Sequence, residues 1–212
     1  MFISLEGIEG SGKSTQVRNL GAWLETRGRQ VKLTREPGST ALGQKLRALL
    51  LDSRQSPIGA TAELFLFLAD RAQHVQEVIR PALDAGQIVI CDRYADSTIA
   101  YQGYGRGMDL AQIKGLCHQA AAGLEPDLTL ILDISPDSGL ARAAQRNYRE
   151  GTAESEGRFE AESLAFHGRI RDGYLALARE CPARFEVIDA GMSEDKVFEQ
   201  CLNAVVKRMG YV

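Results

Sequence analysis

Residues 7–14 read Gly-Ile-Glu-Gly-Ser-Gly-Lys-Ser and fit the phosphate-binding loop pattern, which is Gly, four residues, then Gly-Lys-Ser or Gly-Lys-Thr. A short apolar run, Phe2 to Leu5, precedes the loop, and a helical pattern follows from Lys13. A strand, a glycine-rich turn and a helix start present backbone N–H groups and the positive end of a helix dipole to an anion. The sequence therefore predicts a nucleoside triphosphate site.

The motif also gives its polar residues separate roles. Lys13 can reach the β- and γ-phosphates, and the Ser14 hydroxyl can bind Mg²⁺. A glycine-rich turn without a ligand is the alternative, but it would leave Lys13 beside a helix N-terminus, where a cation is unfavourable. The residues expected to bind the triphosphate are Gly7, Ile8, Glu9, Gly10, Ser11, Gly12, Lys13, Ser14 and Thr15.

The composition is that of an ordinary globular protein. The chain has 212 residues, of which 44% are hydrophobic and 25% charged, and its net charge of −3 gives no general attraction to nucleic acid or to an anionic membrane. No apolar run approaches membrane-spanning length, and the sequence begins directly with a strand pattern. The four cysteines are widely spaced and no histidine lies at metal-ligand spacing from them, which favours reduced thiols over a zinc site. We expect a cytoplasmic protein with neither nucleic acid nor membrane as a partner.

Five short apolar runs alternate with helical patterns along the chain. This alternation predicts an α/β fold with a doubly wound parallel sheet and right-handed crossovers. No linker is visible, so we expect one domain spanning residues 1–212. The five predicted strands are Phe2–Leu5, Val31–Arg35, Gln87–Cys91, Leu128–Leu132 and Phe185–Asp189.

Acidic and basic residues follow several of these strands, at the edge where ligands of parallel sheets bind. Asp92 ends a buried strand at the position that holds the metal through water in phosphate-loop proteins, and Arg93 beside it would face the phosphates. Asp133 has the same placement, but it precedes a helix start, so a structural or N-capping role is expected there. Arg35 and Glu36 lie on the same edge, with an ordinary turn salt bridge as the alternative.

Phe67 and Arg71 lie four residues apart and share one helix face within a helix expected from Thr61 to Leu83. An aromatic ring beside a guanidinium can hold a planar base, although Phe67 in the core with a solvated Arg71 explains the spacing equally well. Ser97 and Tyr101 are one helical turn apart in a following stretch that ends in several glycines.

The stretch from residue 142 to 158 is rich in arginine and glutamate, with few apolar residues between Tyr148 and Phe159. Two interpretations remain open for it. One is a charged surface loop, and the other is a mobile lid that brings arginines onto a transferring phosphate and excludes water. We call residues 142–158 the lid segment.

Taken together, these motifs resemble those of the bacterial thymidylate kinases over essentially the whole chain. The residues that carry the resemblance are the phosphate loop with Glu9, Arg35-Glu36-Pro37-Gly38, Phe67 to Arg71, Asp92-Arg93-Tyr94, Ser97 to Gln102, Gly105-Arg106-Gly107 and the arginines up to Arg158. The resemblance implies a P-loop NTPase fold with sheet order 2-3-1-4-5, a homodimer, and Mg²⁺-dependent transfer of the ATP γ-phosphoryl group to dTMP.

The resemblance also implies roles for individual residues. Phe67 would stack on thymine, Arg71, Gln102 and Ser97 would contact the base, and Tyr101 would lie under the sugar. Glu9 would address the sugar 3′-hydroxyl, and Arg93 would bridge the acceptor phosphate and the γ-phosphate. Arg35 and Glu36 complete the expected dTMP contacts.

In one branch of that family an arginine sits inside the phosphate loop, where this chain has Gly10. The resemblance therefore implies the branch whose catalytic arginine comes from the lid. The candidates are Arg146, Arg149 and Arg158, while Arg142 would lie against adenine.

The chemistry inferred for the site needs no general base, because a phosphate monoester with a second pKa of about 6 is already a dianion at neutral pH. Accordingly, no histidine is expected near the site. The alternatives are another nucleoside or nucleoside-monophosphate kinase on the same fold, a GTPase switch, and a non-catalytic ATP-binding module. The absence of an Asn-Lys-x-Asp segment argues against the GTPase, and Arg93 with the lid arginines argues against the non-catalytic module.

Overall fold

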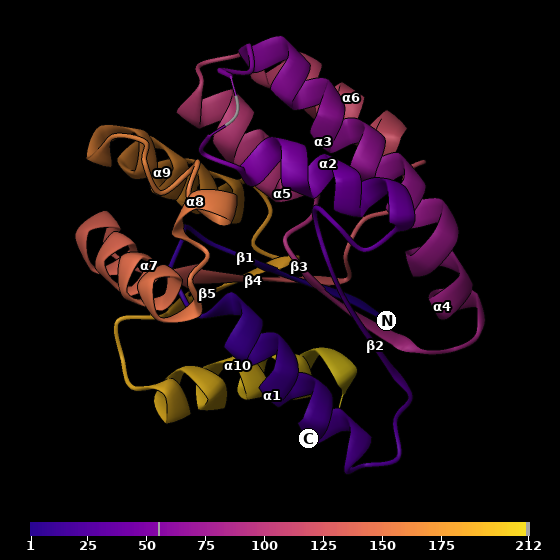
Figure 1. The fold of residues 1–212 in the computed structure, drawn as a ribbon. Helices are drawn as coiled ribbons and strands as arrows, with labels where there is room; N and C mark the ends of the chain where they lie inside the picture. The colour runs from indigo at the N-terminus through magenta and orange to yellow at the C-terminus, as the bar shows by residue number, and fades with distance from the viewer. Residues whose placement is uncertain (55, 211–212) are drawn as a thin grey trace.

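The computed structural model describes residues 1–54 and 56–210, and its centre is one parallel sheet with strand order β2-β3-β1-β4-β5 (Figure 1). This order confirms the fold and the strand order expected from the sequence. The strands are β1 (Phe2–Glu6), β2 (Val31–Arg35), β3 (Ile88–Asp92), β4 (Leu128–Asp133) and β5 (Phe185–Asp189).

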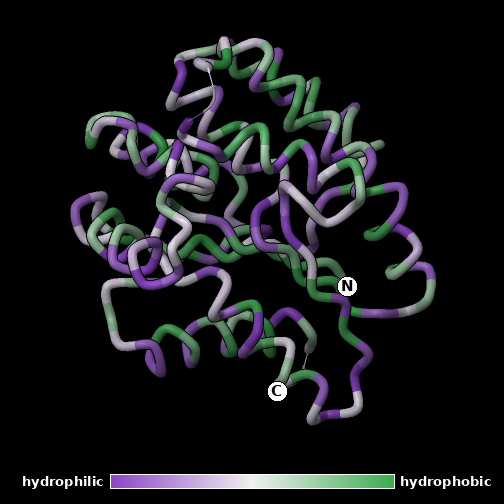
Figure 2. The backbone as a smooth tube through the Cα atoms, in the orientation of Figure 1, coloured by the Kyte–Doolittle hydropathy of each residue, from purple (hydrophilic) through white to green (hydrophobic). Residues whose placement is uncertain are grey.

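Burial differs between the central and the edge strands. All residues of β1, and all but the last of β3 and β4, are buried, as expected for continuous apolar runs covered on both faces. The edge strands β2 and β5 mix buried with exposed positions. Figure 2 shows the hydrophobic stretches of the chain gathered along the central strands.

Helices cover both faces of the sheet. Figure 1 shows α1 and α10 beside each other on one face, and α2, α3, α5 and α6 on the other. No helix in residues 1–54 and 56–210 is both long and apolar enough to cross a membrane. The helices are α1 (Lys13–Glu25), α2 (Ala41–Leu51), α3 (Ala60–His74), α4 (Arg80–Asp84), α5 (Ala95–Thr98), α6 (Leu110–Ala120), α7 (Pro136–Glu150), α8 (Ala153–Glu156), α9 (Leu164–Glu180) and α10 (Glu194–Met209), with two π-helical segments, η1 (Val75–Ile79) and η2 (Ile99–Gly105).

The helix expected from Thr61 to Leu83 is continuous but not uniform, because η1 separates α3 from α4. Pro81 lies in the first turn of α4, and proline has no N–H to donate and crowds the carbonyl group four residues earlier. A wider π turn just before it accommodates this loss. The second π-helical segment, η2, carries Tyr101 and Gln102, and such segments are frequent at functional sites.

Side chains cap the N-termini of several helices, but not that of α1, which follows the phosphate loop. Side chains of Thr40, Asp109, Ser135 and Ser163 accept hydrogen bonds from backbone N–H groups at the starts of α2, α6, α7 and α9. In contrast, α1 begins after Gly12, which has no side chain to cap it, and its first turn has no acidic residue. The N–H groups at the start of α1 therefore face the loop without a competing side-chain anion.

An ion pair between the buried Asp96 and the partly buried Arg184 ties the β5 side of the sheet to α5. Arg184 donates to both carboxylate oxygens of Asp96, at 2.6 and 2.9 Å, and to the Thr129 hydroxyl at 3.0 Å. Asp96 is almost completely buried, so the ion pair with Arg184 is needed to offset the cost of burying its carboxylate.

We predict that Arg184→Met lowers the free energy of unfolding by about 3–5 kcal/mol, because it leaves the Asp96 carboxylate buried and unpaired. Urea denaturation measures this change. Lys114→Met is the matched control, since its ion pair with Glu180 is exposed and contributes about 0–1 kcal/mol. Equal losses in the two variants would contradict the prediction.

Candidate active site

A cavity of about 840 Å³ opens at the carboxyl ends of the central strands. Gly7, Ile8 and Arg158 do not line it, whereas the other expected site residues do. Those are Glu9, Gly10, Ser11, Gly12, Lys13, Ser14, Thr15, Arg35, Glu36, Phe67, Arg71, Asp92, Arg93, Ser97, Tyr101, Gln102, Arg142, Arg146 and Arg149.

The phosphate loop depends on glycine at Gly10 and Gly12, whose φ angles of 68° and 93° lie in the left-handed region. Gly10 is also crowded, because a Cβ there would lie 1.9 Å from the carbonyl oxygen of Gly139 in α7. The loop and the start of α7 therefore pack backbone to backbone. This contact excludes any side chain at position 10 unless α7 moves.

The Lys13 side chain lies against the phosphate loop and donates hydrogen bonds to it. Its ammonium group donates to the carbonyl oxygens of Gly7 at 3.0 Å and Ile8 at 2.8 Å, and to the Ser11 hydroxyl at 3.2 Å. Burial, followed by the nearby Arg93 guanidinium, lowers the pKa of Lys13 to about 8. The side chain is thus held against the loop as a desolvated cation.

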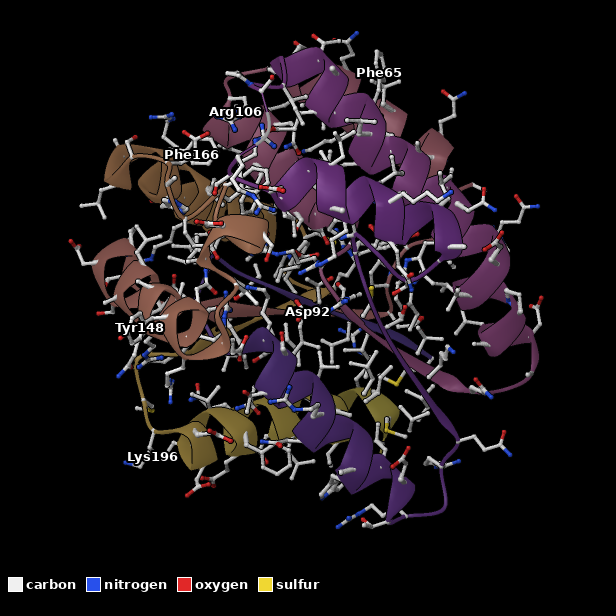
Figure 3. All side chains as sticks on the ribbon, viewed as in Figure 1. Phe65, Asp92, Arg106, Tyr148, Phe166 and Lys196 are labelled. Atoms are coloured by element: carbon white, nitrogen blue, oxygen red, sulfur yellow. The ribbon has the colours of Figure 1, made fainter. Side chains whose placement is uncertain are left out.

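Ser14 and Asp92 meet at the edge of the cavity, where the Ser14 hydroxyl donates to Asp92 Oδ2 at 2.6 Å. Asp92 ends β3 and lies near the centre of the molecule in Figure 3. Within the described residues no group of three or more histidine, cysteine or acidic side chains is arranged to hold a metal. One hydroxyl and one carboxylate fit Mg²⁺, which keeps several waters and completes its shell with nucleotide phosphates.

Glu9 and Arg93 form the central ion pair of the cavity, with 2.9 Å between Glu9 Oε1 and Arg93 Nη2. The Tyr101 hydroxyl donates to the same Glu9 oxygen at 2.5 Å. Burial alone would raise the pKa of Glu9, but Arg93 and the neighbouring His167 outweigh it, so the net pKa is well below the usual range. The Glu9 carboxyl is therefore ionised in spite of its burial.

Arg93 is held from several sides. Its Nη1 donates to the Gly7 carbonyl oxygen at 3.0 Å, and its guanidinium lies 5.0 Å from the centre of the Tyr101 ring. Its φ of 69° is costly for a residue with a side chain. The structure thus maintains a strained backbone at the residue that lies between the loop and the rest of the cavity.

An aromatic chamber forms the other end of the cavity. Phe159 lies 6.1 Å from Phe67 and 5.5 Å from Tyr101, measured between ring centres. Phe67 is half-buried against the core and also lines the cavity, so the two interpretations of its spacing are not exclusive. The three rings line the cavity and offer an aromatic surface on which a planar ligand can stack.

Arg71 borders this chamber but is not the solvated residue of the simpler interpretation, because only 2% of it is exposed. Its Nε and Nη2 lie 3.0 and 2.9 Å from Glu36 Oε2, and Nη2 also donates to the Tyr94 carbonyl oxygen at 3.0 Å. His74 Nδ1 lies 2.9 Å from the other Glu36 oxygen. Glu36 therefore fixes the orientation of Arg71, and the pair spans β2 and α3 rather than forming a turn salt bridge with the exposed Arg35.

Ser97 and Gln102 each donate a hydrogen bond to a buried carboxylate. The Ser97 hydroxyl donates to Glu6 Oε2 at 2.6 Å, and burial raises the pKa of Glu6 to about 7. The Gln102 amide donates to Glu63 Oε1 at 2.9 Å. This hydrogen bond uses the amide nitrogen of Gln102 and not its carbonyl oxygen.

Most of the lid segment is helical, in α7 and α8. Arg142, Arg146 and Arg149 extend from α7, where Arg142 donates to the Ala190 carbonyl oxygen at 2.9 Å and Arg146 lies 3.3 Å from Glu160. The glycines at 151 and 157 bracket a polar segment that is not expected to pack on the core, and its residues 153–155 are exposed, whereas Phe159, just beyond the lid segment, is buried in the core.

Arg158 differs from the expectation that it faces the phosphates. Its guanidinium lies 2.5 Å from the buried Glu63 in α3 and donates to the Leu50 carbonyl oxygen at 2.9 Å. Arg106 reaches the same Glu63 carboxylate at 3.2 Å. Figure 3 shows Arg106 beside Phe166, and its guanidinium lies 4.6 Å from the centre of that ring.

The expectation of no histidine near the site is wrong. His74 contacts Glu36, and His167 Nδ1 lies 3.2 Å from Glu9 Oε2. Both rings are completely buried. Their contacts join residues that are far apart in the sequence, so spacing gives no signal for them, whereas Glu6 could have been found by the rule that identified Asp92, an acid at the end of a buried strand.

Asp133 has the structural role expected of it, though not as a cap. Both of its oxygens accept hydrogen bonds from Arg171, at 2.6 and 2.8 Å, and Ser135 caps α7 instead. Asp92 is thus the strand-end aspartate that faces the phosphate loop.

A phosphate loop and a separate aromatic chamber share one cavity, with an arginine between them, and this arrangement defines a P-loop nucleotide kinase. Comparisons with known proteins narrow the class. A family model described as thymidylate kinase matches residues 5–201. The chain is 60% identical to the thymidylate kinase of Solidesulfovibrio magneticus over 98% of this chain and 99% of that one, and 58% identical to that of Desulfovibrio desulfuricans over 97% and 94%.

A solved structure agrees with these relatives. The crystal structure of thymidylate kinase from Ehrlichia chaffeensis is similar with a TM-score of 0.76 and 35% identity, covering 97% of this chain and 98% of that one. The chain belongs to the thymidylate kinase family.

We predict that ATP affinity falls as the pH rises above about 8. The protonated Lys13 attracts the phosphates and the neutral amine does not, so above the pKa of about 8 binding must take up a proton and the association constant falls about tenfold per pH unit. Isothermal titration calorimetry between pH 7 and 9.5 measures this. In Lys13→Arg, which stays charged, the slope should vanish, and a flat profile in the wild-type protein would contradict the prediction.

Proposed function

We propose that the chain transfers the γ-phosphoryl group of ATP to dTMP and forms dTDP. The observation that carries this proposal is the single cavity with the phosphate loop at one end, the chamber of Phe67, Arg71 and Phe159 at the other, and Arg93 between them. Two nucleotides bound at these ends would meet at Arg93. The assignment of roles to particular residues is part of the proposal.

The chemistry is one of charge and positioning rather than of proton transfer. The acceptor phosphate is mostly a dianion at neutral pH, so its oxygen is already nucleophilic. What opposes the reaction is the approach of two polyanions and the charge spread over the transferring group. Lys13, Arg93 and one lid arginine are the cations that we assign to this charge. Lys13, Arg93 and the lid arginines of α7 line the same cavity.

We assign Mg²⁺ to Ser14 and Asp92, whose oxygens already meet at 2.6 Å. When bound there, the ion would neutralise charge on the phosphates and help to hold them in line. The donor set supports this choice of ion because it consists of hard oxygens and leaves most positions to water and phosphate.

The base site is assigned to the aromatic chamber. Phe67 would stack on thymine, and Arg71, held rigid by Glu36, would donate to a base carbonyl oxygen. Gln102 would add a second hydrogen bond, with Glu63 fixing its amide nitrogen. Ser97, Arg35 and Glu36 border this side of the cavity and would support the acceptor nucleotide.

Glu9 is assigned to the sugar. A carboxylate within a phosphate site would repel both substrates unless it accepts a hydrogen bond from a neutral donor, and the deoxyribose 3′-hydroxyl is such a donor. Tyr101 lies beside it, donating to the same carboxylate, and would occupy the space under the sugar ring. On this assignment the acceptor phosphate competes with Glu9 for Arg93.

We predict that kcat/KM is highest for dTMP in a panel with dUMP, dCMP, dGMP and thymidine, each assayed with ATP. Arg71 is a donor and cytosine presents an amine where thymine has a carbonyl oxygen, so dCMP should be at least about 10²-fold poorer. Thymidine, which lacks the acceptor phosphate, should give no product. A better rate with another acceptor would favour the alternative, a different nucleoside-monophosphate kinase.

Arg71→Ala sharpens this test. It should raise KM for dTMP at least tenfold while KM for ATP changes little, whereas the exposed Arg27→Ala serves as a matched control and should change neither. An equal effect of Arg71→Ala on both substrates would contradict the base assignment. Melting temperatures of both variants show whether the loss of the Glu36 partner has affected folding.

The lid segment is assigned to the ATP side. Arg142 borders the part of the cavity formed by Ala190, Met192 and Val197, which would receive adenine. Arg146 and Arg149 line the cavity from α7 and are the lid arginines that we propose for the transferring phosphate. Arg158 is assigned to anchoring the segment through Glu63.

We predict that alanine at Arg146 or Arg149 lowers kcat at least about 10²-fold in one of the two variants, because a cation aimed at the transferring phosphate is lost. Steady-state kinetics at saturating substrates measure this. Arg179→Ala on the exposed face of α9 is the matched control and should be silent. Two silent lid variants would remove the proposed role of this segment.

We further propose a cytoplasmic homodimer in which the whole chain acts as one kinase domain. Free thiols at Cys91, Cys117, Cys181 and Cys201 support a reducing compartment. Exposed apolar side chains on two adjacent helices support self-association. They are Leu42 and Leu49 on α2 and Phe65 on α3, which points outward in Figure 3.

A further inference from the structure

His167 on α9 is a completely buried histidine in contact with two parts of the active site. Its Nε2 lies 3.0 Å from the carbonyl oxygen of Phe159, the residue that follows the lid segment. Its Nδ1 lies 3.2 Å from Glu9 Oε2, in the phosphate loop. One imidazole ring thus connects the loop to the aromatic chamber.

The protons on this ring follow from its neighbours. A carbonyl oxygen only accepts, so Nε2 carries a hydrogen, and an unprotonated Nδ1 would then direct its lone pair at an ionised carboxylate. A proton on Nδ1 makes the same contact attractive. Glu9 Oε2 and His167 Nδ1 are both buried, lie 3.2 Å apart and have no other hydrogen-bond partner in the described residues, so a hydrogen bond between them would satisfy both atoms.

The two oxygens of Glu9 are therefore divided between different partners. Oε1 accepts from Arg93 and Tyr101, and Oε2 faces His167. Contacts at both oxygens fix the plane of the carboxylate. With contacts at one oxygen only, the carboxylate could rotate about its bond to the side chain. When an acceptor phosphate draws Arg93 away, His167 remains in contact with the other carboxylate oxygen of Glu9.

We propose that His167 is a positioning residue that orients the Glu9 carboxylate for the sugar hydroxyl of the acceptor nucleotide. The inference rests on the proposed sugar role of Glu9 and extends it to a residue that touches no substrate. A histidine that only fills space and holds the Phe159 carbonyl oxygen is the alternative. The difference between the two lies in the Nδ1 contact.

Two amide substitutions separate the contacts of the ring. His167→Asn keeps a donor near the Nδ1 position, and His167→Gln keeps one near the Nε2 position. Each variant is assayed with ATP and with two acceptors, dTMP and its 3′-deoxy analogue. The measured quantities are KM for each substrate, kcat, and the ratio of kcat/KM between the two acceptors, which reports the hydrogen bond to the 3′-hydroxyl.

We expect His167→Gln to raise KM for dTMP about tenfold and to reduce the preference for the 3′-hydroxyl by a similar factor, with KM for ATP unchanged within about twofold. His167→Asn should retain most of the wild-type preference. If His167→Gln keeps the full preference, or if both variants lose it equally, the inference is overturned. A wild-type protein indifferent to the 3′-hydroxyl would instead overturn the sugar role of Glu9, and the inference with it.

A double-mutant cycle with Glu9→Gln keeps the question open to measurement even if His167→Asn folds poorly. If His167 acts through Glu9, the effect of His167→Gln on KM for dTMP should largely disappear in the Glu9→Gln background. Additive effects would overturn the inference. Circular dichroism melting of each single variant shows that the kinetics refer to folded protein.

Discussion

The ion pair between Glu9 and Arg93 is the interaction on which the rest of the cavity depends. It joins the phosphate loop to the residue after β3 at 2.9 Å, and it holds Arg93 in a strained backbone conformation between the two ends of the cavity. Burial makes both charges costly, so each needs its partners. Tyr101 and His167 complete the shell of Glu9, and their helical segments are thereby fixed relative to the loop. A protein built to bind anions thus keeps one carboxylate at its centre to hold its cations in place.

The same arrangement recurs further out, where buried carboxylates orient the groups that border the ligand site. Glu36 forms an ion pair with Arg71, and Glu6 accepts a hydrogen bond from Ser97. Glu63 accepts a hydrogen bond from Gln102 and forms ion pairs with Arg106 and Arg158. In each case the acid contacts a residue that lines the cavity or anchors a segment beside it. Such hydrogen-bonded support restricts rotamers, and this pre-organisation is what electrostatic catalysis requires.

The sequence predicted the fold well because its signals were local. The phosphate loop, the five apolar runs and the acids at the strand ends each lie within a few residues, and topology rules place the strand ends at one edge. It failed for contacts between distant parts of the chain. Arg158 was expected at the phosphates and lies against Glu63, and His74 and His167 were not expected at all. A charged residue in a polar stretch does not reveal that its partner is a buried acid in a distant helix. A histidine among apolar residues is indistinguishable by pattern from an ordinary core residue.

The contact between Gly10 and Gly139 has a consequence for how such enzymes can change. Any side chain at position 10 would meet the backbone of α7 at 1.9 Å, and the φ of 68° at Gly10 disfavours one as well. A residue with a side chain at position 10 is therefore compatible with this fold only if α7 lies farther from the phosphate loop, so the loop sequence and the position of α7 must change together.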